Sequence, residues 1–147
     1  MEYEQLKLEN QVCFPIYTAS RLIIRQYTPF LDELGITYPQ YLVMLLLWET
    51  DHLTVNDITE KLLLNTNTIT PLLKRLEAQG LITRQRSTED ERRVIVSLTT
   101  EGASMKEAAA SIPERLVASL ASNTMSVEDI STLVSQVCKI INHLSDK

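Results

Sequence analysis

The 147-residue sequence predicts a mainly α-helical fold that carries one small β-hairpin, and two patterns indicate this class. Over most of the chain, apolar residues recur at spacings of three and four, as on the buried face of a helix. After Gly80 the spacing changes to the alternation typical of a half-buried strand. The length suits one domain with its own core, so we expect residues 1–147 to form a single domain.

The first two helices are predicted from an apolar stripe and an apolar run. The first helix should end near Gly35, and Pro29 can kink it. The second should begin near Pro39, because proline suits a first turn, and the run 41–48 indicates burial on most sides. The stripe of the first helix consists of Ile16, Ala19, Ile23, Tyr27, Phe30 and Leu34.

Two shorter helices should follow. Thr54 and Asp57 have the spacing of a capping box, which opens the third helix. Asn65 or Thr66 can cap the fourth helix, and Gly80 can end it. The polar outer face of this fourth helix carries Asn67, Thr70, Lys74 and Arg75.

The predicted hairpin joins strands 81–86 and 93–98 through the charged loop 87–92. Two short helices followed by such a hairpin form the order of a winged helix-turn-helix, whose second helix enters the DNA major groove. We therefore expect a winged helix-turn-helix part at 36–98. The flanking segments, 1–35 and 99–147, should form a helical dimerisation part.

The C-terminal helices are predicted to support dimerisation. Thr99 or Thr100 should open a fifth helix that runs to about Leu120, with a kink or a break at Pro113. Ser126 with Asp129 can cap a sixth helix. A small winged domain cannot cover the apolar stripe of this helix alone, so we expect a homodimer. The stripe contains Ile130, Leu133, Val134, Val137, Ile141 and Leu144.

Composition argues against several classes of function. No apolar run approaches the ~18 residues of a membrane span, and the N-terminus lacks a secretory signal, so we expect a cytoplasmic protein with no membrane partner. Isolated glycines argue against a phosphate-binding loop, and no esterase motif occurs. Cys13 and Cys138 form no metal-binding pattern. We therefore expect neither an enzyme, nor a metal, nor a cofactor.

Charge is distributed unevenly along the chain. The net charge is −5, but residues 66–93 carry six basic and four acidic side chains, a net +2, which leaves −7 for the remainder. Phosphate attraction acts over roughly 8 to 10 Å, so a basic segment in an acidic body suits a localised contact with DNA.

Several segments resemble one family. The segment from Asp90 to Thr99 (DERRVIVSLT), preceded by 72–77 (LLKRLE) and 80–82 (GLI), is similar to the wing region of MarR-family regulators. The segments 8–14 (LENQVCF) and 37–41 (TYPQY) narrow the resemblance to the organic hydroperoxide resistance (OhrR) branch. It covers nearly the whole chain and fades in the last quarter.

The resemblance implies a redox site. In that branch an early cysteine senses peroxide, and tyrosines from the partner subunit support its thiolate. The matching residues are Cys13, Tyr27 and Tyr38, and Tyr17 matches a further tyrosine near the thiol. The implied inducer is an organic hydroperoxide, after which a low-molecular-weight thiol forms a mixed disulfide.

The resemblance also implies a DNA interface. The carboxylate of Asp90 should hold Arg92, which enters the minor groove. Asn65-Thr66-Asn67 stands where close relatives carry aspartate, serine and glycine, so operator preference can differ. Other candidate contacts to phosphates and base edges are Thr66, Asn67, Thr68, Thr70, Lys74, Arg75, Arg84 and Arg86.

The residues around Cys13 support thiol chemistry independently. Pro15 is tolerated early in a helix, so the first helix should start near Val12 and place Cys13 in its first turn. Unpaired N–H groups and the helix dipole favour an anion there, and the thiolate is the form that attacks a peroxide. Phenol groups of Tyr27 and Tyr38 would add hydrogen bonds. Pro15 replaces an aliphatic residue of the relatives and can alter the local geometry.

The leading hypothesis is a repressor that binds a pseudo-palindromic operator on double-stranded DNA and is released by oxidation of Cys13. Three alternatives stay open: a MarR regulator released by an aromatic small molecule, a thiol peroxidase that uses Cys13, and a winged-helix module that binds protein. Cys138 is interpreted as a packing residue, and the alternative is a role in resolving oxidised Cys13.

Overall fold

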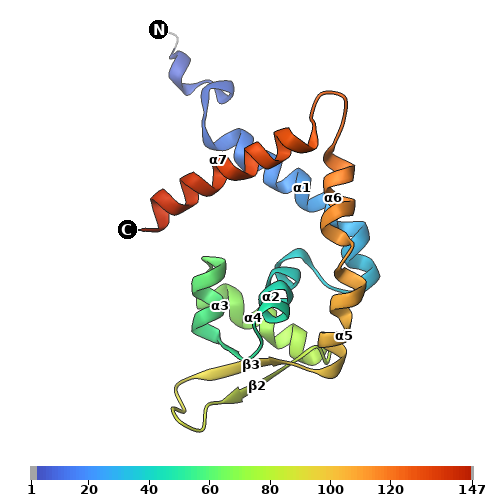
Figure 1. Cartoon of the computed structure of the whole chain (residues 1–147). Helices are drawn as coiled ribbons and strands as arrows, with labels where there is room; N and C mark the ends of the chain where they lie inside the picture. The colour runs from blue at the N-terminus through green and yellow to red at the C-terminus, as the bar shows by residue number, and fades with distance from the viewer. Residues whose placement is uncertain (1–2, 147) are drawn as a thin grey trace. The chain divides into compact units, whose positions relative to one another are not determined.

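The computed structural model describes residues 3–146 (Figure 1). Its helices and small sheet confirm the predicted fold class. Two 3-10 turns, Glu4–Leu6 and Leu8–Asn10, precede helices α1 (Cys13–Leu34), α2 (Tyr38–Glu49), α3 (Val55–Leu62), α4 (Thr66–Ala78), α5 (Thr100–Ala109), α6 (Ile112–Leu120) and α7 (Val127–Ser145). The strands are β1 (Leu53–Thr54), β2 (Ile82–Arg86) and β3 (Val94–Leu98). Within residues 3–146, no helix has the length and apolar character needed to span a membrane.

The chain divides into two compact units, which we describe separately. The winged-helix unit contains residues 28–110, and the other unit combines the residues up to Tyr27 with those from Ser111 onward. The winged-helix unit contains the segment 36–98 together with the end of α1 and the whole of α5. Leu31 in the last part of α1 and Ala109 at the end of α5 are both buried.

Helix α2 supplies most of the core of the winged-helix unit. It begins with a capping box that we did not predict, in which the Thr37 hydroxyl accepts the backbone N–H of Gln40 (3.4 Å) and the Gln40 side chain accepts the N–H of Thr37 (2.9 Å). The predicted burial of α2 is confirmed on one broad face. Its buried apolar residues are Tyr41, Val43, Met44, Leu47 and Trp48.

Helices α3 and α4 form the helix-turn-helix. The predicted capping box of α3 is present, because Thr54 Oγ1 accepts the N–H of Asp57 (3.1 Å) and the Asp57 carboxylate accepts the N–H of Thr54 (2.9 Å). Leu63 ends α3 with a left-handed backbone (φ 53°). Asn65 then caps α4 by accepting the N–H of Thr68 at 2.9 Å. These local hydrogen bonds position the first turn of α4.

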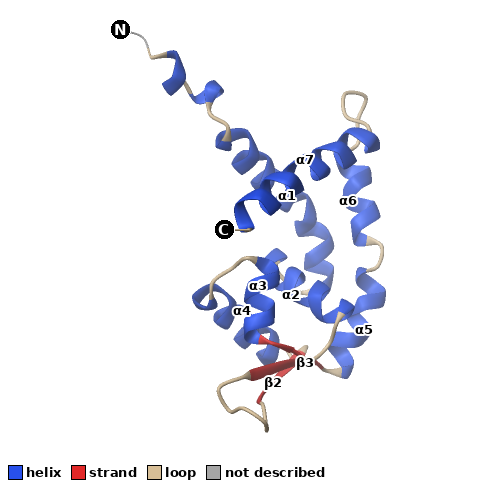
Figure 2. Ribbon diagram, turned by 60° about the vertical axis from the view of Figure 1, so that its left-hand side comes forward, coloured by secondary structure: helices blue, strands red, loops and turns tan. Residues whose placement is uncertain are grey.

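The sheet is antiparallel with strand order β1-β3-β2, and the loop between β2 and β3 extends as the wing (Figure 2). Strands β2 and β3 form the predicted hairpin, each starting one residue later than expected. Strand β1 was not predicted. Its Leu53 pairs with Val96, which is fully buried in the centre of the sheet.

The C-terminal helices confirm the predicted break near Pro113. Helix α5 ends at Ala109, and α6 begins at Ile112 with Pro113 in its first turn. A capping box of Ser126 and Asp129 opens α7, as predicted. No residue of α7 is buried, and most of its apolar stripe is exposed within the described part of one chain, with only Ile130 and Val137 half-buried.

Candidate functional site: a DNA interface and a redox cysteine

The first turn of α4 presents a polar surface. Thr66, Asn67 and Thr68 are all exposed, and the Thr68 hydroxyl donates to Asn65 Oδ1 at 3.1 Å. Thr70 is half-buried one turn further along. The four uncharged contacts predicted on α4 therefore differ, since Thr68 is partly engaged by the cap while Thr66 and Asn67 are exposed.

A hollow of about 280 Å³ lies between the start of α3, helix α4 and the base of the wing. Thr66 and Thr70 line it from α4, and Arg84, Arg92 and Arg93 line it from the hairpin. Three arginines facing two threonine hydroxyls suit a phosphate group, because guanidinium groups pair with phosphate oxygens through forked hydrogen bonds.

Arg84 is engaged within the protein. Its Nη2 donates to Glu77 Oε1 at 3.1 Å, which ties β2 to the last turn of α4. The hydrogen bond from the Arg84 side chain holds the pKa of the Glu77 carboxyl below its ordinary value. The sequence analysis missed Glu77, because nothing local in the sequence indicates a partner in the following strand.

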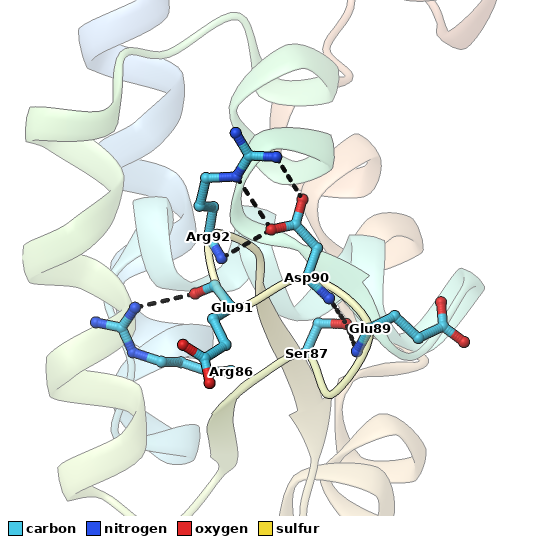
Figure 3. A network of polar contacts seen from close by, with 6 residues as sticks. All are labelled: Arg86, Ser87, Glu89, Asp90, Glu91 and Arg92. Carbon is cyan, nitrogen blue, oxygen red and sulfur yellow. Dashed lines mark hydrogen bonds and ion pairs between the residues drawn. The ribbon is translucent and has the colours of Figure 1, made fainter.

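The wing loop holds Arg92 through Asp90 (Figure 3). Arg92 donates from Nε to Asp90 Oδ1 at 3.1 Å and from Nη2 to Oδ2 at 3.4 Å, and its backbone N–H also donates to Oδ1 at 3.1 Å. These bonds lower the pKa of the Asp90 carboxyl, the Arg92 side chain contributing most. The Arg92 side chain is 90% exposed, so its guanidinium is oriented yet accessible.

The other basic candidates differ in whether their side chains are already bonded within the protein. Arg86 donates from Nη1 to the Glu91 carbonyl oxygen at 2.9 Å, which braces the wing loop. Lys74 and Arg75 are exposed on α4, and within residues 3–146 neither forms an ion pair. Lys74 and Arg75 are therefore available to phosphates.

Cys13 is the first residue of α1, one residue after the predicted start near Val12 and within the predicted first turn, and its thiol is free and exposed. Tyr17 lies one turn further along α1 and is exposed. The Arg21 guanidinium lies over the Tyr17 ring, 4.8 Å from its centroid, so a cation–π contact orients this ring. The thiol thus lies at the N-terminus of a long helix.

Tyr27 and Cys13 are far apart within one chain. Both lie on α1, and a rise of about 1.5 Å per residue separates them by roughly 21 Å along the helix axis. Tyr38 begins α2 in the other unit and is half-buried. Burial raises the pKa of Tyr38 above its ordinary value of 10.0, so the phenol stays protonated and can donate a hydrogen bond. A contact between Tyr27 and a Cys13 thiolate therefore requires a second copy of the chain.

Cys138 is exposed and lies on an apolar groove rather than in packing. The groove has a volume of about 420 Å³ and runs between α1 and α7, with Pro15 and Ile16 on one wall and Val134 and Cys138 on the other. Among residues 3–146, no group of three or more His, Cys, Asp and Glu side chains is arranged to hold a metal ion.

A winged helix-turn-helix with a basic reading face and an exposed N-terminal thiol defines the class of thiol-bearing DNA-binding regulators. Residues 25–109 match the family model for the transcriptional regulators SarA and Rot. The chain is 49% identical over 146 residues to an organic hydroperoxide resistance transcriptional regulator of Bacillus subtilis. The alignment covers 99% of this chain and 97% of that protein.

Solved structures of AbfR, a protein of Staphylococcus epidermidis, are also similar. Reduced AbfR bound to DNA gives a TM-score of 0.77 at 38% identity, covering 98% of this chain and 99% of that chain. AbfR with a disulfide formed gives a TM-score of 0.66 at 39% identity, and the match covers 98% of this chain and 96% of that chain. The chain therefore belongs to the MarR-type transcriptional regulators, in the branch of organic hydroperoxide resistance regulators. It is a regulator and not an enzyme.

Proposed function

We propose that this chain acts in the cytoplasm as a homodimeric repressor, which binds a pseudo-palindromic operator while Cys13 is reduced and releases it when an organic hydroperoxide oxidises Cys13. The observation that carries the proposal is the exposed Cys13 thiol at the first residue of α1, in a chain whose other unit is a winged helix-turn-helix. AbfR, at 38% identity, has been solved both reduced on DNA and with a disulfide formed.

The sensing chemistry needs one oxidant and one small thiol. The Cys13 thiolate attacks the distal peroxide oxygen and breaks the O–O bond, which leaves a sulfenic acid and an alkoxide that takes a proton from water to become the alcohol. A low-molecular-weight thiol then displaces water from the sulfenic acid, forming a mixed disulfide. We assign Tyr27 and Tyr38 of the partner subunit as hydrogen-bond donors to the thiolate. The span of α1 supports that assignment for Tyr27, because it places Tyr27 out of reach of Cys13 in the same chain.

Dimerisation places two copies of α4 on one DNA site. The exposed stripe of α7 supplies apolar surface for a second copy, and the two α4 helices would lie about 34 to 36 Å apart, one DNA turn. We assign the first turn of α4 to the major groove and Arg92 to the minor groove. A bulky mixed disulfide on Cys13 would displace the partner's tyrosines and change that spacing.

The test is a DNA-binding titration with cumene hydroperoxide and L-cysteine, using a duplex selected from a random pool by the reduced protein. We expect wild type to release the duplex, Cys13→Ser to retain it, and Cys138→Ser to behave as wild type. If Cys13→Ser releases DNA as readily as wild type, the proposal fails. Release by salicylate but not by peroxide would instead favour a regulator that senses an aromatic ligand.

A further inference from the structure

Two glutamine side chains connect the turn before Tyr38 to the end of α4. Gln40, only 4% exposed, accepts the backbone N–H of Thr37 at 2.9 Å and donates from Nε2 to Gln79 Oε1 at 3.0 Å. Gln79 donates from its own Nε2 to the Gly35 carbonyl oxygen at 2.8 Å. We call these three hydrogen bonds the glutamine clamp. It lies entirely within the winged-helix unit.

Each end of the clamp is attached to a functional element. Gln79 is the residue that caps α4, and its backbone N–H bonds to the Arg75 carbonyl oxygen at 2.9 Å. At the other end, Thr37 directly precedes Tyr38, which is packed with Tyr41 at a ring separation of 6.4 Å. A movement of Tyr38 therefore acts on a turn that is bonded to the last turn of α4.

We propose that Gln40 and Gln79 are positioning residues that couple the redox state of Cys13 to the orientation of α4, a proposal that rests on the proposed function. When Cys13 is oxidised, Tyr38 loses its partner thiolate and the turn shifts. Gln79 holds the C-terminal end of α4, about 20 Å from the first turn of this helix, which contacts DNA. A small shift of Gln79 therefore changes the orientation of that first turn.

The chemistry of the clamp favours two discrete states over gradual loosening. Gln40 is buried, so an amide that loses its partner there leaves an unsatisfied polar group, which is costly. The turn and α4 therefore move together until the clamp breaks as a unit. A structural role alone predicts a different result, since cutting the clamp would then lower stability and leave the response to oxidation unchanged.

The experiment compares DNA affinity before and after oxidation in three variants. Gln79→Ala removes both of its side-chain hydrogen bonds. Gln40→Glu keeps an oxygen for the N–H of Thr37, and so keeps the cap of α2, but it cannot donate to Gln79. The matched control is Gln136→Ala, an exposed glutamine of α7 that lies off its apolar stripe. The probe is the selected duplex, with cumene hydroperoxide and L-cysteine as oxidising reagents.

The measured quantity is the ratio of the oxidised to the reduced dissociation constant. We expect this ratio to fall about fivefold or more in Gln79→Ala and Gln40→Glu, a factor within the range of allosteric couplings, and to be unchanged in Gln136→Ala. Ratios within twofold of wild type in both clamp variants would overturn the clamp proposal alone. If wild type itself shows no change in affinity on oxidation, the proposed function fails, and the clamp proposal fails with it.

Discussion

Glu77 and Arg84 join the last turn of α4 to β2 through both oxygens of one carboxylate. Oε1 accepts from Arg84 Nη2 at 3.1 Å, and Oε2 accepts from the Arg84 backbone N–H at 3.0 Å. One side chain thus sets the position of the wing relative to the recognition helix. Because this guanidinium is already paired, Arg84 has less freedom to bind phosphate than Lys74 or Arg75.

Arg84→Ala is expected to weaken DNA binding by misplacing the wing. The slope of log affinity against log salt should stay close to wild type, because no phosphate contact is lost. Lys74→Ala serves as the comparison and should reduce the slope by about 0.9, the value for one lost phosphate contact on duplex DNA. Fluorescence anisotropy over a range of salt concentrations measures both. An equal loss of slope in the two variants would show that Arg84 contacts a phosphate directly.

Asp90→Ala is expected to weaken DNA binding a few-fold although it removes a negative charge from the DNA-facing wing. Simple electrostatics predicts tighter binding, whereas loss of the two hydrogen bonds that orient Arg92 predicts weaker binding. Glu89→Ala is the control, since Glu89 is exposed on the same loop and its carboxylate makes no hydrogen bond within residues 3–146. Tighter binding in both variants would mean that Asp90 does not position Arg92.

Thr54→Val is expected to lower the free energy of unfolding and to weaken its decrease with falling pH. Hydrogen bonds from the side chain and backbone of Thr54 lower the pKa of Asp57 from its ordinary 3.8. A lowered carboxyl pKa stabilises the fold above the unfolded pKa, and this contribution is lost as pH falls through the folded pKa. Loss of the cap should cost about 1 kcal/mol at neutral pH.

Urea unfolding at neutral pH and well below pH 3.8 measures the change. The difference in the free energy of unfolding between wild type and Thr54→Val should be largest at neutral pH and should become smaller in acid. Thr83→Val, at an exposed position of β2, is the control and should show no such narrowing. A gap independent of pH would indicate that the cap and the Asp57 carboxylate are not linked.

Most features with a local signal were predicted from the sequence, although the equally local capping box of Thr37 and Gln40 was missed. The capping boxes that begin at Thr54 and Ser126 depend on residues three apart, and the hairpin depends on alternation within a few residues. The position of Cys13 at a helix start followed from Pro15 two residues later. In each of these cases the physical cause lies within one turn of helix or one strand.

Features that depend on distant partners were missed. Strand β1 exists because Leu53 pairs with Val96, and two residues carry no periodicity of their own. The Gln40–Gln79 hydrogen bond joins residues that are 39 positions apart. The proposed redox site was expected only from the resemblance to the family, because the length of α1 keeps Tyr27 away from Cys13 in the same chain. No spacing within one sequence describes a contact between two copies.

Gly102→Ala is expected to be strongly destabilising, although Gly102 lies in a helix where alanine is normally preferred. An added Cβ would lie 2.0 Å from the Leu81 carbonyl oxygen, and the Gly102 carbonyl itself accepts from Trp48 Nε1 at 2.8 Å. Overpacking against backbone typically costs about 1–3 kcal/mol. A Cβ added at Gly35 would meet no atom within 4 Å, but the backbone φ there is +68°. Gly35→Ala should therefore cost about 1–2 kcal/mol. Urea unfolding that ranks Gly35→Ala as the more damaging variant would contradict this packing.

Val134→Glu is expected to convert the dimer into a monomer and to abolish high-affinity DNA binding. Val134 is 56% exposed on α7 and lines the apolar groove against α1, so the glutamate costs little in an isolated chain but is strongly disfavoured in an apolar interface. Ser135→Glu is the matched control, because Ser135 is exposed, helical periodicity places it off the stripe, and the variant introduces the same charge one residue later. Light scattering reads the mass directly, from twice 16.7 kDa for wild type and Ser135→Glu to 16.7 kDa for Val134→Glu. Since a monomer engages one half-site only, its DNA affinity should fall steeply at the same protein concentration. A Val134→Glu protein that stays dimeric would place the subunit interface away from this groove.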